Sequence, residues 1–422
     1  MKLKPRRFPL HLQILVAIGV GLAVGPLLGK QAQPLGELGK LVIQLIKATA
    51  TPLLFFAIVS ATLKTEVRGR AALKLLSWAT LNACLALLLG LALSNLFRPG
   101  RSLLGLHPNQ TAAAAAYASK KLDLLATLNG VVPTSFVAPF AENLVLGVIL
   151  LALLVGLGLR FVKREQRADG EAHYLAVESA VTTLLRLMEV VLGWVIRLIP
   201  LAIFGVVARA VGEHGYAPLR GLAAYVAVGL GGLALHVLVT YQCLLTWVAR
   251  MPLCKFWAAA KEPVSYAAGA NSSLATLPVT LRALDRLGVP RSASALGACV
   301  GTNFNNDGII LYEGMAVLFV AQAAGIELSV TQQLLAAAIC LVAAMGVAGV
   351  PEAGFVSLAL VLNTVGLPLE LLPLLLTVDW IIARGRSVVN VLSDMVLSIL
   401  LVGSAPPEGE LEPAEVVLQP SE

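Results

Sequence analysis

The chain alternates long apolar runs with short, charged segments, and the apolar runs reach the length of a membrane-spanning helix. About 20 predominantly apolar residues are needed to cross the hydrocarbon core of a bilayer. Eight runs of this kind predict eight transmembrane helices, and two further apolar runs are broken by polar residues. The pattern therefore predicts an all-α polytopic membrane protein.

We divide the chain according to this pattern. Spans one and two lie within 1–70, span three within 71–98, and spans four and five, with a less apolar insertion, within 99–215. Span six lies within 216–250, the first broken run within 251–288 and span seven within 289–324. The second broken run lies within 325–368 and span eight within 369–403, and an acidic tail covers 404–422. The tail is rich in Pro and Glu, a composition typical of disordered segments.

The two broken runs have apolar halves on either side of turn-forming residues. Their centres read YAAGANSSLATLPVTL in 251–288 and MGVAGVPEAG in 325–368. Gly, Asn, Ser and Pro at such positions favour turns over helix interiors. Each run is therefore predicted to be a re-entrant hairpin, and a pair of these indicates the binding site of a transporter. The alternative is two unrelated loops whose flanks are apolar.

The last span contains residues that a lipid-facing helix excludes. It reads TVDWIIARGRSVVNVLSDMVLSI and includes Asp379, Arg384, Arg386, Asn390 and Asp394. A charge at bilayer depth costs at least ~3 kcal/mol, so such residues face a partner, a cavity or a ligand. Most of them follow helical spacing and are predicted to form one stripe.

Span seven is interrupted by the polar sequence GTNFNNDG. Asn305, Asp307 and Gly308 are expected to unwind the helix and expose carbonyl groups. Exposed carbonyls beside a buried carboxylate suit a hard cation such as Na⁺. Glu313 lies at membrane depth, where desolvation favours its protonated form, which makes it a candidate proton carrier. The alternative for this cluster is a polar network between helices.

Composition and charge agree with a membrane protein. The chain of 422 residues is 58% hydrophobic and 13% charged, whereas soluble domains carry roughly 25% charged residues. Basic residues recur in the loops after every second span, so the positive-inside rule favours cytoplasmic N- and C-termini. The net charge of +7 comes from these loops and reflects the orientation of the chain in the membrane.

We therefore expect no nucleic-acid partner. The five cysteines lack CxxC spacing and no nucleophile motif occurs, so we expect no enzyme and no cofactor beyond coupling cations.

Taken in order, the motifs PLLFFAIVSA, SSLATLP, NNDG, AGVPEAG and VDWIIARGRSVVNVLSD resemble those of the dicarboxylate/amino acid:cation symporter family over nearly the whole chain. The resemblance implies a homotrimer in the plasma or inner membrane. It also implies an elevator-type fold, in which spans one, two, four and five form a scaffold. Spans three, six, seven and eight would then form a mobile transport domain with both hairpins.

The resemblance also implies a substrate site. Carried onto this sequence, it falls on Ser272, Ser273, Val350, Gly354, Asp379, Ala383, Arg384, Arg386 and Asn390. Arg386 matches an arginine that pairs with a substrate carboxylate, whereas Ala383 replaces an aspartate that holds the ammonium in amino acid carriers. A buried ammonium without an anion is strongly disfavoured. Two arginines without an added acidic partner therefore favour a small anion with two carboxylates, such as succinate.

The implied cation sites are less complete. The Na⁺ ligands fall on Asn303, Asn305, Asp307, Asn390 and Asp394, and Glu313 matches the glutamate thought to carry a proton in vertebrate acidic transporters. Asn303 stands where the family has a threonine, which weakens the implied Na⁺ site and favours coupling of transport to protons. Coupling to Na⁺ remains an alternative.

These observations predict a cation-coupled symporter of small organic anions, with C4-dicarboxylates as the favoured substrates. One alternative keeps the fold and transports acidic or neutral amino acids, with the ammonium held by hairpin carbonyls or Asp379. A second alternative is an anion channel or a non-transporting sensor on the same scaffold.

Overall fold

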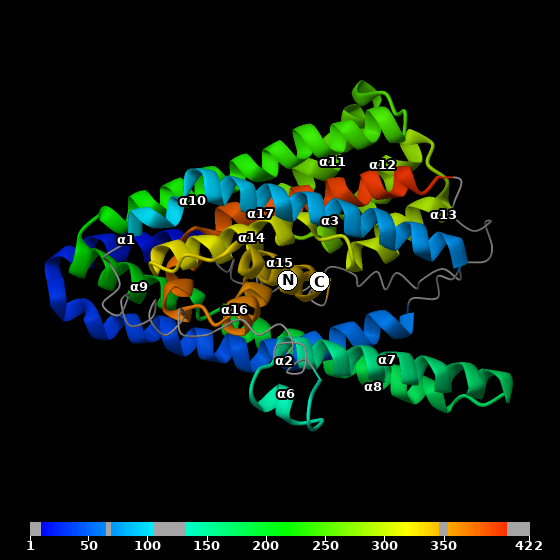
Figure 1. Cartoon of the computed structure of the whole chain (residues 1–422), viewed down its shortest axis with the longest axis horizontal. Coiled ribbons are helices and arrows are strands. Elements are labelled where there is room, and N and C mark those ends of the chain that lie inside the picture. The colour runs from blue at the N-terminus through cyan, green and yellow to red at the C-terminus, as the bar shows by residue number, and fades with distance from the viewer. Residues whose placement is uncertain (1–9, 65–68, 104–131, 346–352, 403–422) are drawn as a thin grey trace, which may run out of the picture.

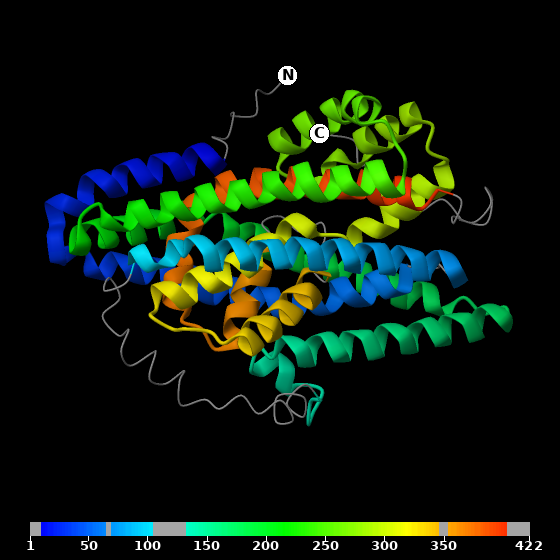
Figure 2. The ribbon, with the colours of Figure 1, turned by 45° about the horizontal axis from the view of Figure 1, so that its top comes forward.

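The structure is a computed structural model that describes residues 10–64, 69–103, 132–345 and 353–402 (Figure 1). Every regular element in these residues is helical. Most of the long helices run along one common axis, as in a bundle (Figures 1 and 2). The predicted all-α fold class is therefore confirmed for the described part of the chain.

The longer helices are α1 (Leu10–Leu28), α2 (Glu37–Lys64), α3 (Gly69–Phe97), α7 (Val145–Ala168), α8 (His173–Ile196), α9 (Ile199–His214), α10 (Ala217–Leu235), α11 (Leu253–Ala270), α12 (Ser273–Leu287), α14 (Asp307–Ala323), α15 (Val330–Met345), α16 (Ala353–Val365) and α17 (Leu372–Leu400). Short helices are α6 (Ala138–Ala141) and α13 (Arg291–Ser294). Two π-helical segments, His236–Tyr241 and Leu244–Val248, continue α10.

Within the described residues, several helical stretches are long and apolar enough to cross a membrane. They are Leu12–Leu63, Leu73–Phe97, His173–His214 and Ala217–Val248. The other predicted spans are helical too, but they are short or interrupted by charged residues. The count of eight crossings therefore stays a prediction.

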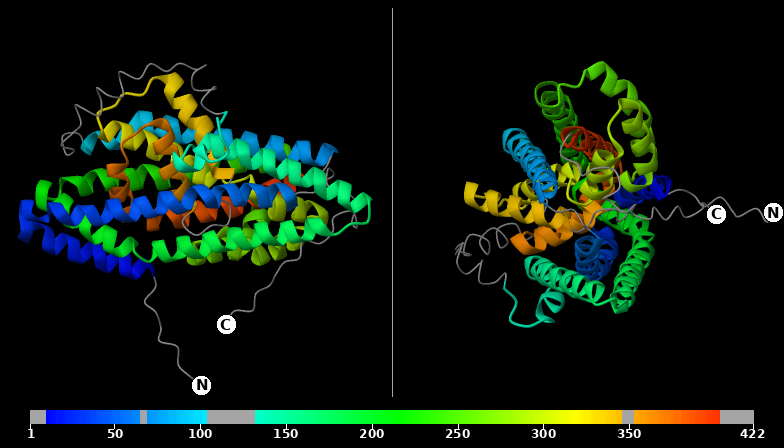
Figure 3. Two further views of the ribbon diagram at one scale, coloured as in Figure 1. Left: turned by 90° about the horizontal axis from the view of Figure 1, so that it is seen from below. Right: turned by 90° about the vertical axis from the view of Figure 1, so that its right-hand side faces the viewer.

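The helices pack in two groups. In the first group, called the α2 group, α2 packs against α7, α8 and α9, and α1 packs against α9. In the second, called the α14 group, α14 packs against α3, α16 and α17, and α10 to α12 pack around α17. Figure 3 (right) shows α7 and α8 on one side of the molecule and α10 to α12 on the opposite side. The two groups meet where α16 contacts α2 and where α17 contacts α9.

The two central helices of the α14 group are covered almost completely by protein. All residues of α14 except Gln322 are buried, as are most residues of α17, including its polar stripe. A helix that is hydrophobic on every side belongs in a protein interior. Asp379, Arg386 and Asp394 of the last span are therefore enclosed by other helices, as the sequence predicts, whereas Arg384 is only half-buried.

The first broken run forms a helical hairpin. α11 ends at Ala270 and is followed by Asn271, which adopts the left-handed conformation with φ 52° that asparagine tolerates better than most residues. Ser272 then caps the N-terminus of α12, because its hydroxyl accepts a hydrogen bond from the backbone N–H of Ala275 at 3.2 Å. The second broken run supplies α15 and α16, which pack against each other; their connection, 346–352, lies outside the described residues.

The interruption of span seven is confirmed. Residues 304–306 are not helical, and α14 starts at Asp307. Gly308 lies so close to α17 that a Cβ atom there would be 2.6 Å from the carbonyl oxygen of Arg386. Only glycine allows this approach, which brings the start of α14 against the polar stripe.

Candidate functional site

The site is built around Arg386, at the middle of α17. Its guanidinium group donates two hydrogen bonds to the carboxylate of Asp379, at 2.7 and 3.0 Å, and both side chains are buried. The Cζ atom of Arg386 also lies 4.1 Å from the centre of the Tyr312 ring, a cation–π contact. The guanidinium is thus held in one orientation by a bidentate ion pair and an aromatic face.

This pairing corrects the sequence-based count of charges. The expectation that Arg386 has no acidic partner is wrong, because Asp379 lies two helical turns earlier on the same face of α17. A substrate carboxylate that binds Arg386 must therefore share the guanidinium with Asp379 or replace it.

Arg384 does not join Arg386. It donates a hydrogen bond to the carbonyl oxygen of Trp380 at 2.6 Å, and its Cζ atom lies 5.5 Å from the centre of the Trp380 ring. Residues two positions apart on a helix point about 200° away from each other. The expectation that both arginines face one anion is therefore not met within the described residues.

Both hairpins approach α17 beside Arg386. The hydroxyl of Ser387 donates to the side-chain oxygen of Asn271 at the tip of the first hairpin, at 3.2 Å. In the second hairpin, a Cβ atom on Gly354 would lie 3.0 Å from the Cζ atom of Arg386. Ser272 and Ser273 are half-buried at the first tip, and Val350 lies outside the described residues.

Ala383 lies on the buried face of α17, between the levels of Asp379 and Arg386. Its side chain is 3% exposed. The position where an amino acid carrier needs an anion is thus occupied by a methyl group that faces protein.

Asp307, at the start of α14, is the centre of a second polar cluster. One carboxylate oxygen, Oδ2, accepts hydrogen bonds from the side chains of Asn82, Tyr241 and Ser393. The Nε2 atom of His236 lies 3.6 Å from the same oxygen. Three helical segments other than α14 therefore converge on one buried carboxylate, which fixes α3, the π-helical end of α10 and α17 around it.

Asn390 and Asp394 connect the C-terminal half of α17 to the non-helical residues before α14. The side-chain oxygen of Asn390 accepts from the backbone N–H of Gly308 at 2.8 Å, and its amide donates to Asn306 at 3.4 Å. The amide of Asn305 donates to Asp394 at 3.5 Å. The structure therefore brings these predicted ligands together around the break in span seven. Asn303 lies in the preceding helical turn, and its side chain is not among the described ones.

The donor set of this region fits a hard cation. Within the described residues, the side-chain oxygens Oδ1 of Asn82, Asn305 and Asp307 are buried and have no hydrogen-bond partner. Burial of unpartnered polar atoms is costly, and Na⁺ is held by amide and carboxylate oxygens such as these. The residues present therefore fit a sodium ion that Asp307 and its neighbours would hold.

Glu313 lies fully buried on α14, between the two arms of the second hairpin. Its Oε1 atom accepts a hydrogen bond from Ser357 of α16, and Cys340 of α15 lies within hydrogen-bonding reach. The second oxygen, Oε2, has no partner among the described residues. The carboxyl group thus contacts both arms of the second hairpin.

Several side chains of the site escaped the sequence analysis. Tyr312, Tyr241, His236 and Ser393 contact Arg386 or Asp307. Ser393 lies three residues after Asn390, so the helical spacing of the polar stripe was a signal for it. The two tyrosines and the histidine read as ordinary residues of apolar spans, and no periodicity marks them.

Comparison with known proteins identifies a family that covers nearly the whole chain. A model of the sodium:dicarboxylate symporter family matches residues 10–403. The C4-dicarboxylate transport protein of Anaeromyxobacter sp. (strain K) is 32% identical over 96% of this chain and 91% of its own length. The corresponding protein of Deinococcus radiodurans is 30% identical over 94% of this chain and 89% of its own length. The chain is therefore a transport protein and not an enzyme, and it belongs to the sodium:dicarboxylate symporter family.

Proposed function

We propose that the protein is a cation-coupled secondary symporter that carries C4-dicarboxylates across the plasma or inner membrane. The observation that carries this proposal is Arg386, a buried guanidinium between two hairpins, with Ala383 where an ammonium would need an anion. The names of the similar proteins, C4-dicarboxylate transport proteins, support the same substrate class.

The two carboxylates of the substrate have different binding groups in this proposal. One carboxylate takes the two N–H donors of Arg386 that Asp379 occupies in this structure. The other lies near the N-termini of α12 and α16, which begin at Ser273 and Ala353. The backbone N–H groups of a first helical turn and the positive end of the helix dipole favour an anion there. The helix N-termini thus replace Arg384 as the second anion-binding element.

The amino acid alternative is less compatible with this geometry. It requires an anion for the ammonium group, and the candidate is Asp379, four residues before Ala383 on α17. The carboxylate of Asp379 is already bound by both N–H donors of Arg386. If Asp379 bound a substrate ammonium instead, the Arg386 guanidinium would lose its carboxylate partner, unless a carboxylate of the substrate replaced it.

Coupling follows from linkage between the cation sites and the second hairpin. Na⁺ at Asp307 and Asn305 would order the break before α14, which lies against Arg386 through Gly308. A proton on Glu313 would alter its contacts with both arms of the second hairpin. Any cation that favours the closed hairpin raises the affinity for substrate, and the substrate raises the affinity for the cation by the same factor.

We also propose that the α2 group is the scaffold of a homotrimer and that the α14 group moves as the transport domain. Arg186 and Glu189 on α8 form an ion pair of 2.9 Å, and the arginine side chain is 66% exposed in the single chain. Charges at membrane depth need protein or water around them. A neighbouring protomer that covers this face of α8 provides that environment.

Substrate class is tested by ligand-induced thermal stabilisation. We expect succinate to stabilise the purified protein and aspartate to leave its melting temperature unchanged. In Ala383→Asp, the new carboxylate is expected to weaken succinate binding by about tenfold or more through like-charge repulsion and to permit binding of aspartate. If aspartate raised the melting temperature of the wild type, and succinate did not compete with it for binding, the amino acid alternative would be favoured.

The role of Glu313 is tested by Glu313→Gln. Glutamine keeps the size and accepts the Ser357 hydrogen bond but carries no proton across the membrane. Succinate uptake driven by a pH gradient should therefore fall by at least about tenfold, while exchange of internal for external succinate continues. The matched control is Glu327→Gln, an exposed acid that contacts Arg101. Uptake that still follows the pH gradient in Glu313→Gln would exclude Glu313 as the carrier.

A further inference from the structure

The two helix groups are joined by a hydrogen bond between residues that lie far apart in the sequence. The ammonium of Lys47, on α2, donates to the side-chain oxygen of Asn363, on α16, at 2.9 Å. Lys47 belongs to the α2 group and Asn363 to the α14 group, and α16 packs directly against α2 (Figure 1). The bond therefore crosses the boundary at which the two groups meet.

Lys47 is a half-buried cation whose hydrogen-bond partner carries no charge. It lies in the helical stretch Leu12–Leu63, which is long and apolar enough to cross a membrane, and a cation in such a stretch needs polar neighbours. Among the residues that the structure describes, no carboxylate forms an ion pair with Lys47, and Glu370, between α16 and α17, attracts its charge from a larger distance. Movement of the α14 group along α2 therefore separates Lys47 from both compensating groups.

Asn363 uses both ends of its side-chain amide at this boundary. An ammonium only donates hydrogen bonds, so the amide oxygen faces Lys47. The amide nitrogen donates to the backbone carbonyl of Asn143, which precedes α7, at 3.5 Å. The side-chain oxygen of Asn143 in turn accepts from the hydroxyl of Thr51 at 2.7 Å, and Thr51 lies one helical turn after Lys47 on α2. The α2 group therefore binds Asn363 from two sides.

The helix that carries Asn363 also contacts the substrate and proton sites. Near the start of α16, Gly354 lies against Arg386 and Ser357 donates to Glu313. Asn363 lies near the end of the same helix, about 14 Å farther along its axis. Because α16 is one uninterrupted helix, a movement that carries the substrate site past α2 also carries Asn363 away from its partners.

We propose that a latch of four residues holds the transport domain in the arrangement of this structure, and that its opening sets the rate of domain movement. The latch consists of Lys47, Thr51, Asn143 and Asn363. The proposal rests on the assignment of the α14 group as the moving domain. A hydrogen bond to a charged group is stronger than one between neutral groups, and this one breaks whenever the α14 group slides past α2. The latch acts on the rate of transport and not on the affinity, because none of its printed hydrogen bonds reaches the substrate or cation sites.

Exchange of internal for external succinate in proteoliposomes measures the opening of the latch. Lys47→Met and Asn363→Leu keep the approximate size of the side chains and remove the bond, so each should raise the maximal exchange rate about tenfold. Lys47→Met/Asn363→Leu should be no faster than either single variant, because both residues act through one contact. Asn363→Asp should instead lower the rate about tenfold, because an ion pair with Lys47 is stronger than a bond to a neutral amide.

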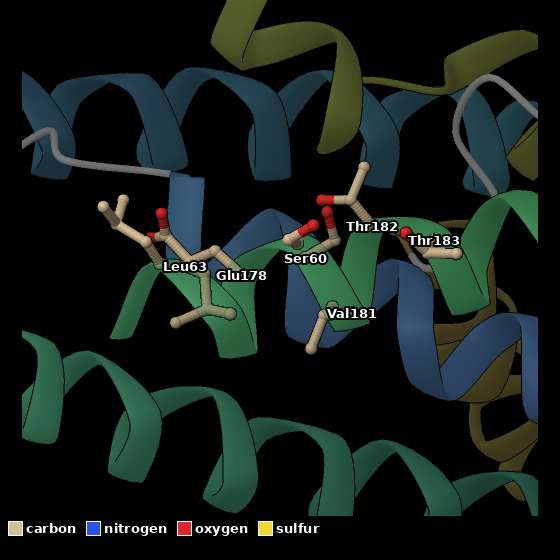
Figure 4. A pocket seen from close by; sticks show the side chains of 8 residues that line it. Ser60, Leu63, Glu178, Val181, Thr182 and Thr183 are labelled. Carbon is tan, nitrogen blue, oxygen red and sulfur yellow. The ribbon is translucent and has the colours of Figure 1, made fainter. Parts of the chain in front are cut away.

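The matched control is Lys163→Met. Lys163 on α7 pairs with Glu178 of α8 at 2.5 Å, beside the pocket between α2 and α8 (Figure 4), so this ion pair lies within the α2 group and its loss should leave the exchange rate unchanged. Succinate affinity, measured by calorimetric titration, should stay within about threefold of the wild type in every latch variant. A slower exchange in Lys47→Met, or an equal acceleration in Lys163→Met, would overturn the proposal.

Pulsed electron paramagnetic resonance tests the latch without a substrate. Nitroxide labels are attached at Leu154→Cys on α7 and Tyr266→Cys on α11, two exposed positions in different groups, in a chain whose native cysteines are replaced by serine. Lys47→Met should reduce the share of molecules with the label distance of this arrangement, and Asn363→Asp should increase it. Equal distance distributions in these variants and the wild type would refute the latch. If the shifts occur but the wild type exchanges no succinate, the proposed substrate is wrong and the latch stands.

Discussion

Arg386→Ala is expected to lower the affinity for succinate by at least about a hundredfold and to abolish uptake. The variant removes the bidentate donor and leaves the Asp379 carboxylate buried without its partner. Truncating one partner of a buried, hydrogen-bonded charge pair between a protein and its ligand costs roughly 2–5 kcal/mol of binding free energy, and each 1.4 kcal/mol is about tenfold in affinity. Calorimetric titration of the purified variant with succinate measures this loss.

Two control variants separate loss of the ligand contact from loss of the fold. Arg384→Ala removes a guanidinium that lies on Trp380, and it should change succinate affinity by less than about threefold. Asp379→Asn/Arg386→Gln removes both charges, so the protein should regain stability relative to Arg386→Ala without regaining succinate binding. If Arg384→Ala were as damaging as Arg386→Ala, or if the double variant bound succinate normally, Arg386 would not be the anion-binding group.

Asp307→Asn is expected to raise the Na⁺ concentration for half-maximal uptake by about a hundredfold or more. The amide keeps the shape of the side chain and still accepts hydrogen bonds from Tyr241 and Ser393. It lacks the negative charge that a hard cation requires from its oxygen ligands. Breaking a buried charge pair costs several kcal/mol, and about 2.8 kcal/mol is a hundredfold.

The measurement is a Na⁺ titration of succinate uptake, supported by Na⁺-dependent thermal stabilisation without substrate. Asp285→Asn is the matched control, because Asp285 is an exposed acid near Arg291 at the end of the first hairpin. Its Na⁺ dependence should equal that of the wild type. An unchanged Na⁺ response in Asp307→Asn would remove Asp307 from the cation site.

The fold was largely predictable because its signals are local. The turn at Asn271, the break before Asp307 and the polar stripe on α17 each follow from residue types at short spacing. A stripe of charged residues in an apolar helix also predicts burial against protein, since lipid excludes it. These features required no knowledge of how distant segments pack.

The pairing within the site was not predictable in the same way. Helical spacing places Asp379 and Arg386 on one face but does not say whether they bind each other or a shared ligand. The charge count from sequence treated the two residues as independent and was wrong for that reason. Tyr241 and His236 reach Asp307 from a π-helical segment, which shifts the register of side chains relative to an α-helix.

The central claim is that cation gradients drive the accumulation of a dicarboxylate through the Arg386 site. Uptake of labelled succinate and labelled aspartate into proteoliposomes tests it directly, with Na⁺ and pH gradients imposed separately and Arg386→Ala as the inactive control. The account predicts that succinate accumulates against its gradient when an inward cation gradient is present, and that excess aspartate does not inhibit it. Accumulation of aspartate instead, or succinate movement that ignores both gradients, would contradict the account.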